Sequence, residues 1–261
     1  MNSLPVTVHD SRSALGSAAA QDIADALVAA VAARGSARVV FAAAPSQQET
    51  LDALVQVDGV PWDRVDALHM DEYVGLPVGA PERFAVWLDR TLFGRLPFRS
   101  VHRIDPGSDP EAEAARYATV VADGPIDVVV LGIGENGHIA FNDPPVAAFD
   151  DPVLAKLVDL DDACREQQVA DECFARFADV PKRAITLTVP ALMSGARLVC
   201  VVKGERKAAA VRATFEEPVS TTWPSTILRT HPSCVVHLDR QLLPSCRSPH
   251  EHRAVGPLRF R

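Results

Sequence analysis

Cysteine is scarce in this chain, and the few cysteines form no recognisable pattern. Their number is odd and no two stand in a C-x-x-C arrangement: Cys164, Cys173, Cys200, Cys234 and Cys246. Such spacing supports neither a disulfide framework nor a zinc site. We therefore expect no metal centre.

Basic segments and long apolar segments are also missing. The formal net charge is -8, and no basic run with interleaved aromatic residues precedes the tail, which argues against nucleic acid as a partner. Charged residues or prolines interrupt the apolar stretches before they reach the roughly 20 residues that span a membrane. The first twenty residues contain Asp10 and Arg12 where a signal peptide would be apolar. We expect a cytoplasmic protein with no membrane partner.

What the chain does contain is enough apolar residues for one large core, because 48% of its 261 residues are hydrophobic. Apolar, β-branched runs alternate with helical patterns, which predicts an α/β fold with a parallel sheet. The predicted strands are 6–10, 37–44, 65–70, 101–104, 126–131, 184–189, 196–202 and 234–239, and the predicted helices begin near residues 12, 48, 81, 109 and 203. We expect a single domain over 1–243 and a flexible tail over 244–261.

The most informative stretch follows the predicted strand 126–131. Three glycines of the sequence GIGENGH allow close ligand approach, and polar side chains crowd around them. The spacing resembles a dinucleotide-binding fingerprint, but no long amphipathic helix follows, so we reject that interpretation. His138 is the one side chain of the cluster with a pKa near neutrality, and Asp143 is close enough in sequence to orient it. A glycine turn with a structural histidine is the simpler alternative.

Two other strand ends carry candidate site residues. Asp71 and Glu72 follow the strand 65–70, where burial and like charge raise the pKa of a carboxyl group. A helix-capping Asp beside a solvated Glu is the alternative. Ser46 stands between the strand 37–44 and a helix, at a position suited to a phosphate or to an ordinary N-cap. Lys207 falls in a first helical turn, where a cation opposes the helix dipole unless an anion binds there.

Two of these motifs carry a resemblance to a known family. GIGENGHIAFNDP, residues 132–144, and MDEYVGLP, residues 70–77, resemble signatures of the glucosamine-6-phosphate deaminase/isomerase family, which is related to the 6-phosphogluconolactonases. The resemblance extends over about 37–239. It implies a three-layer α/β sandwich with a Rossmann-like, mostly parallel sheet and a small lid over about 146–180. It also implies a homo-oligomer, because the family is often hexameric.

The resemblance implies cofactor-free chemistry on a sugar phosphate. An amino-sugar phosphate such as glucosamine 6-phosphate would be isomerised and would lose ammonia to give fructose 6-phosphate. Asp71 would be the general base for the C2 proton, and His138 would open the ring with Asn136 and Asp143 as its catalytic partners. The expected substrate-binding residues are Ser46, Glu72, Gly137, Arg165 and Lys207.

Some positions depart from the family pattern. Asn136 stands where many deaminases have Asp, and Asp143 stands where Glu is usual. Cys173 falls in register with the lid arginine that binds phosphate, so Arg165 is the expected replacement. Two alternatives to the deaminase therefore stay open: a lactonase that hydrolyses a sugar lactone, and a non-catalytic sugar-phosphate sensor.

Overall fold

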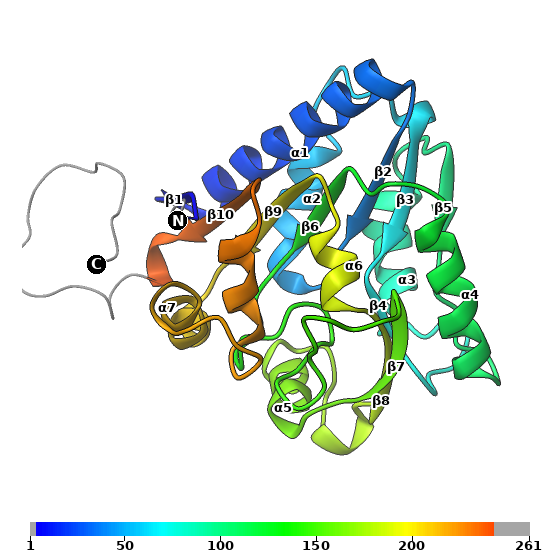
Figure 1. Cartoon of the computed structure of the whole chain (residues 1–261), viewed down its shortest axis with the longest axis vertical. Helices are drawn as coiled ribbons and strands as arrows, with labels where there is room; N and C mark the ends of the chain where they lie inside the picture. Colours follow the sequence, from blue (N-terminus) through cyan, green and yellow to red (C-terminus); the bar gives the residue numbers. More distant parts are fainter. Residues whose placement is uncertain (1–3, 243–261) are drawn as a thin grey trace, which may run out of the picture.

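A seven-stranded parallel sheet forms the centre of the protein (Figure 1). The computed structural model describes residues 4–242, so the predicted tail over 244–261 lies outside the described residues. The strand order is β1-β10-β9-β6-β2-β3-β5. The strands are β1 (Val6–His9), β2 (Ala37–Phe41), β3 (Val65–His69), β5 (Ser100–His102), β6 (Val128–Leu131), β9 (Arg197–Val202) and β10 (Cys234–Asp239). The predicted parallel α/β sheet is confirmed.

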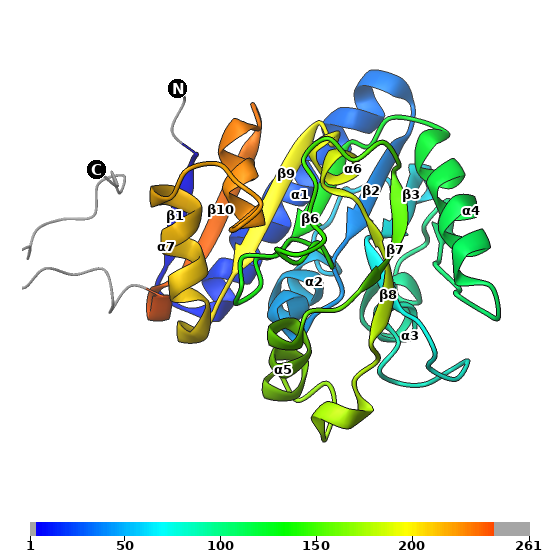
Figure 2. The ribbon, with the colours of Figure 1, turned by 60° about the horizontal axis from the view of Figure 1, so that its bottom comes forward.

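Helices cover both faces of this sheet because its central strands are apolar on both sides. In β2, the side chains of Val39 and Phe41 enter one core and that of Val40 enters the other. The first core packs against α1 (Arg12–Arg34), α2 (Gln48–Leu54) and α3 (Phe84–Leu88), and the second packs against α4 (Pro110–Ala122), α6 (Val189–Met193) and α7 (Ala208–Glu216). Figure 2 shows this three-layer arrangement from a second direction.

The long helix α1 begins and ends where the sequence indicates. The Ser11 side chain accepts a hydrogen bond from the Ala14 amide at 3.1 Å, and Gly35 closes the helix with a φ of 80°. By length and hydropathy α1 could cross a membrane, which differs from the expectation that every apolar stretch is too short. In the structure one face of α1 packs against the sheet and α2, as in the core helix of a globular domain.

A second, antiparallel sheet stands at one end of the molecule. It consists of β4 (Asp71–Tyr73), β8 (Arg183–Leu187) and β7 (Ala155–Asp159), in the order β4-β8-β7. Helix α5 (Asp162–Ala170) follows β7, so the segment predicted as a lid contains a strand and a helix. That this segment moves stays a prediction.

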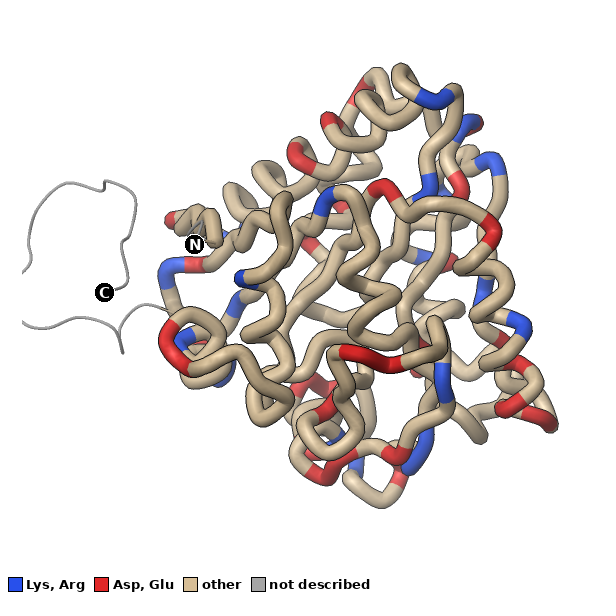
Figure 3. Tube along the Cα trace, viewed as in Figure 1, with Lys and Arg blue, Asp and Glu red and all other residues tan. Residues whose placement is uncertain are grey.

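The helix predicted to begin near residue 81 is short and irregular in the structure. It begins at Phe84 and passes into a π-helical turn, Asp89–Phe93. Lysines and arginines are interspersed with acidic residues along the outer helices and loops, whereas the central strands are mostly uncharged (Figure 3).

Candidate functional site

The candidate residues follow four neighbouring strands of the central sheet and lie together at the carboxyl ends of those strands. In the order β9-β6-β2-β3, the segments that follow these strands carry Lys207, His138, Ser46 and Asp71. All four line one narrow cavity of about 60 Å³. An outer cavity of about 550 Å³ adjoins it and shares Pro45, Ser46, Asp171 and Lys207. Ligands of α/β sheets bind at this carboxyl edge, where the strand ends and helix starts converge.

Glycines shape the loop after β6 so that it folds back on itself. The Gly134 amide donates to the His138 carbonyl at 2.9 Å, and a Cβ on Gly134 would lie 2.2 Å from the His138 ring. Gly137 has a φ of 81°, and a Cβ there would lie 2.8 Å from Trp223. The first glycine therefore makes room for the imidazole. Gly137 lies beside Trp223 and is not among the residues that line the cavity, so its contact with substrate stays a prediction.

His138 is held through its inner ring nitrogen. Its Nδ1 lies 3.0 Å from Asp143 Oδ1 and 2.8 Å from Asn136 Oδ1, both of which are acceptors. The Asn136 amide donates to Asp143 Oδ1 at 2.9 Å. This arrangement places the imidazole proton on Nδ1 and leaves Nε2 with a free lone pair.

Asp143 is completely buried yet stays ionised. Burial alone would raise its pKa, but hydrogen bonds from His138 and Asn136 and from the Asp161 amide lower the pKa of the carboxyl below its ordinary value. The predicted partnership of Asn136, His138 and Asp143 is therefore present as one hydrogen-bonded group.

Asp71 lines the same cavity. Its side chain is 6% exposed and has no hydrogen bond among residues 4–242. Burial, the charge of Glu72 and the charge of Asp143 raise its pKa well above the ordinary value. A carboxylate held in this way is a stronger base than an exposed aspartate.

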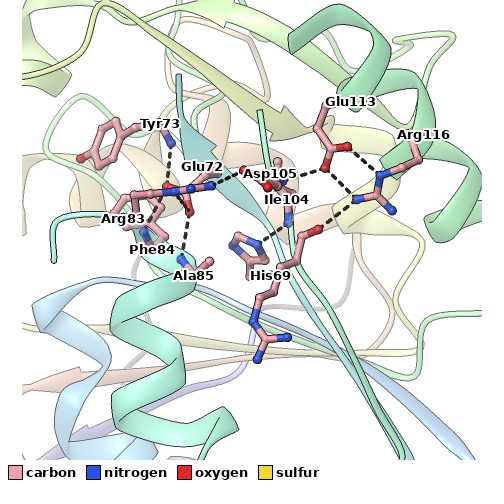
Figure 4. Close-up of polar contacts among 11 residues, drawn as sticks. His69, Glu72, Tyr73, Arg83, Phe84, Ala85, Ile104, Asp105, Glu113 and Arg116 are labelled. Atoms are coloured by element: carbon pink, nitrogen blue, oxygen red, sulfur yellow. Dashed lines mark hydrogen bonds and ion pairs between the residues drawn. The ribbon is translucent and has the colours of Figure 1, made fainter. Parts of the chain in front are cut away.

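Glu72 has a structural task that differs from its predicted contact with substrate. Its carboxylate accepts hydrogen bonds from the amides of Tyr73, Phe84 and Ala85 at 2.9–3.1 Å and lies 3.8 Å from Arg83 (Figure 4). It therefore caps the N-terminus of α3 and does not line the cavity. Burial raises its pKa to about 7, although the three amides and the Arg83 charge oppose the shift.

The same network reaches further from the site. The Arg83 guanidinium donates to the Asp105 carboxylate at 3.0 Å, and the Asp105 amide donates to Glu113 of α4. The Ile104 amide donates to His69 at the end of β3 at 2.8 Å. Figure 4 shows these contacts joining β3 to the segment after β5 and to α4, which fixes the backbone just before Asp71.

Ser46 and Lys207 both line the inner and the outer cavity. Ser46 lies within a 3₁₀ turn, Pro45–Gln47, whose N-cap is Ala44, so Ser46 does not cap the helix. Lys207 is only 7% exposed, and its ammonium group has no ion pair or hydrogen bond among the described residues. Burial lowers the pKa of Lys207, although Asp171 and Glu135 oppose the shift. A buried, unpaired cation that lines a cavity is suited to an anionic ligand.

Arg165 lies elsewhere. Its guanidinium donates to the carbonyls of Phe177 and Val180 at 3.2 Å and stacks over the Phe177 ring at 4.0 Å. It also pairs with Asp162. The structure therefore does not bring Arg165 to the cavity as the sequence predicted. Its guanidinium is instead bound to the Phe177 and Val180 carbonyls near the end of the segment predicted as a lid.

Sequence analysis missed the residues that α5 contributes. Gln167, Gln168 and Asp171 line the inner cavity, and Gln167 Oε1 accepts from the Glu135 amide at 2.8 Å. The segment has no clean apolar period, so its buried face could not be predicted from the sequence. Gln47 was also missed; its Oε1 is buried without a partner and the residue lines the cavity.

One group of side chains has the donor atoms of a metal site. His138, Asp143 and Cys164 place a nitrogen, an oxygen and a sulfur within 4.8 Å of one another. Such a mixed set suits a zinc-class ion. However, the His138 proton already joins the ring to Asp143, and neither Asp143 nor Cys164 lines the cavity. The close approach of His138 and Asp143 is explained by the hydrogen bond between them.

Comparison with known proteins gives a consistent result. The family model of glucosamine-6-phosphate isomerases/6-phosphogluconolactonase matches residues 10–236. A glucosamine-6-phosphate deaminase of an Exiguobacterium species is 37% identical over 190 residues, which cover 72% of this chain and 73% of that one. One from Listeria monocytogenes is 35% identical over 208 residues, covering 79% and 87%.

Solved structures share the fold. A monomeric glucosamine-6-phosphate deaminase superposes with a TM-score of 0.84 at 26% identity, over 94% of this chain and all of that one. A 6-phosphogluconolactonase from Shewanella baltica has a TM-score of 0.75 at 21% identity, over 91% and 98%, which is a likeness of fold alone. With its two signature motifs brought to one cavity, the chain belongs to the family of glucosamine-6-phosphate isomerases and 6-phosphogluconolactonases.

Proposed function

We propose that this protein is a glucosamine-6-phosphate deaminase that converts glucosamine 6-phosphate and water to fructose 6-phosphate and ammonia. The observation that carries the proposal is the pairing of Asp71 with His138 in one cavity, since each follows a different strand and the two flank the end of β2. Isomerisation needs two proton-transfer groups on one substrate, and this cavity supplies two of different kind. The deaminase relatives support the same reaction.

In the proposed reaction each group takes one step. His138 Nε2 takes the proton of the C1 hydroxyl and returns one to the ring oxygen, which opens the sugar ring. Asp143 stabilises the imidazolium during this step because it accepts from Nδ1 at 3.0 Å. Asp71 then removes the C2 proton and delivers it to C1. Water adds to the C2 imine that results, and ammonia leaves.

The phosphate is assigned to the rim of the cavity. The Ser46 hydroxyl and the Lys207 ammonium line both the inner and the outer cavity, so an anion between them would neutralise the buried cation. Gln167 and Gln168 of α5 cover the space between this rim and Asp71 and supply polar groups for sugar hydroxyls. The segment 146–180 would then act as the lid.

The proposal is tested by measuring ammonia and fructose 6-phosphate released from glucosamine 6-phosphate, with galactosamine 6-phosphate and 6-phosphogluconolactone in parallel. We expect turnover of an amino sugar, lowered about 10²–10⁴-fold in His138→Ala and in Asp71→Asn. Lactone hydrolysis without amino-sugar turnover would replace the deaminase with the lactonase. Binding of a sugar phosphate without any turnover would indicate the sensor.

The number of subunits is a separate question. The expected homo-oligomer stays a prediction, and the structural relative with the TM-score of 0.84 is a monomer. Sedimentation of the purified protein at two concentrations tests it. None of the proposed catalytic groups depends on the answer, since Asp71, Asn136, His138 and Asp143 all belong to one chain.

A further inference from the structure

Asp171 is a carboxylate in the space proposed for an anion. It lies at the C-terminal end of α5 and lines the inner cavity, the outer cavity and a third cavity beside Cys173. Its side chain is 18% exposed. A negative charge at a helix C-terminus opposes the helix dipole, so this position is electrostatically unfavourable unless cations compensate.

The compensating cations are those that border the same space. Arg206 forms an ion pair with Asp171 Oδ1, donates to the Ala170 carbonyl at 3.2 Å, and lies 3.3 Å from Glu135 of the loop after β6. Gln167 donates to Asp171 Oδ2 at 3.3 Å. The buried ammonium of Lys207 has no ion pair among the described residues, and Asp171 is the foremost negative charge acting on it.

The backbone holds this carboxylate in place. The Asp171 amide donates to the Gln167 carbonyl at 2.8 Å, and the next residue, Glu172, adopts a φ of 60°. A left-handed conformation is uncommon for glutamate and persists only where the surroundings fix it. Asp171 is therefore positioned by its surroundings at the rim of the cavity.

We propose that Asp171 is a built-in anion of the phosphate site, which competes with the substrate phosphate for Arg206 and Lys207 and so sets how tightly this chain binds phosphate. The inference rests on the proposed function for the identity of the anion. When phosphate binds, Arg206 exchanges one anionic partner for another. Arg206 then no longer joins Asp171, at the C-terminal end of α5, to Glu135 in the loop after β6.

Charge removal at this one position gives the test. Asp171→Asn keeps the shape of the side chain and one of its two acceptor oxygens but removes the competing charge. We expect inorganic phosphate to bind about 5- to 10-fold more tightly in titration calorimetry at low salt, with KM for glucosamine 6-phosphate lowered to a similar extent. The gain should shrink as ionic strength rises, because the rim is partly exposed.

The matched control is Asp162→Asn, on the same helix. Asp162 also pairs with an arginine, but it lines none of the three cavities, so phosphate affinity should not change. A second variant, Arg206→Gln, removes a cation and leaves Asp171 beside Lys207, so phosphate should bind more weakly than in the wild type. Thermal unfolding of each variant establishes that it is folded.

The outcomes separate this inference from the proposed reaction. Weaker or unchanged phosphate binding in Asp171→Asn, or no phosphate binding in either protein, would overturn the built-in anion. Tighter phosphate binding in a protein that turns over no amino sugar would retain the inference and reject the deaminase. Equal tightening by Asp162→Asn would show a general charge effect and would also overturn it.

Discussion

Gly134→Ala should inactivate the enzyme without removing any group that takes part in the reaction. The new Cβ would lie 2.2–2.4 Å from three atoms of the His138 ring. Ordinary van der Waals contact begins near 3.4 Å, so the ring must move by about 1.2 Å. Its 3.0 Å contact with Asp143 would lengthen to about 4 Å, which is beyond hydrogen-bond distance.

The backbone itself tolerates alanine at this position, because Gly134 does not have a positive φ. The loss should therefore fall on catalysis. We expect turnover to drop about 10²–10⁴-fold, as for His138→Ala, and the unfolding free energy to drop by about 1–3 kcal/mol as the bond to Asp143 is lost. The assay is ammonia release, with thermal unfolding measured on the same preparations.

Two further variants sharpen the result. Gly124→Ala is the matched control, because a Cβ there meets Arg38 at an ordinary 3.5 Å. The double variant Gly134→Ala/His138→Ala should be no slower than His138→Ala alone, since both changes act on one ring. Near-normal turnover in Gly134→Ala, or additive losses in the double variant, would refute the reasoning.

Three other changes test the division of roles among the buried charges. Burial and the Glu72 charge raise the pKa of Asp71 in the folded protein. The contribution of Asp71 to the free energy of unfolding is therefore full below the ordinary pKa of 3.8 and is lost as pH rises through the folded pKa. Asp71→Asn should unfold at a higher temperature than the wild type, and the difference should be larger at pH 8 than at pH 5. Glu72→Ala leaves two amides at the start of α3 and the Tyr73 amide of β4 without an acceptor and should cost about 2 kcal/mol in urea unfolding, while KM stays within about twofold. Arg165→Met should lower the unfolding temperature with KM likewise unchanged; a KM raised about tenfold would return Arg165 to the phosphate site.

The sequence by itself determined the central parallel sheet and, through the family resemblance, the candidates for the catalytic groups. Strands such as β2 and β6 are buried along their whole length, and apolar, β-branched runs of this kind predict strands of a parallel sheet that is covered on both faces. The helix α1 could be placed within a residue, because Ser11 and Gly35 act on the backbone next to them. The candidate catalytic residues came from the family resemblance, which rests on two motifs that are each local in sequence, 70–77 and 132–144.

Tertiary structure alone decided which residues share the cavity. Glu72 is adjacent to Asp71 in sequence, yet the two carboxylates of β4 have different surroundings. Glu72 caps the start of α3, whereas Asp71 lines the cavity. Arg165 and Asp171 belong to one short segment, and only its docking shows that the arginine binds carbonyls while the aspartate faces the rim. Local periodicity and capping follow from near neighbours in the chain, whereas these assignments depend on contacts between segments far apart in sequence.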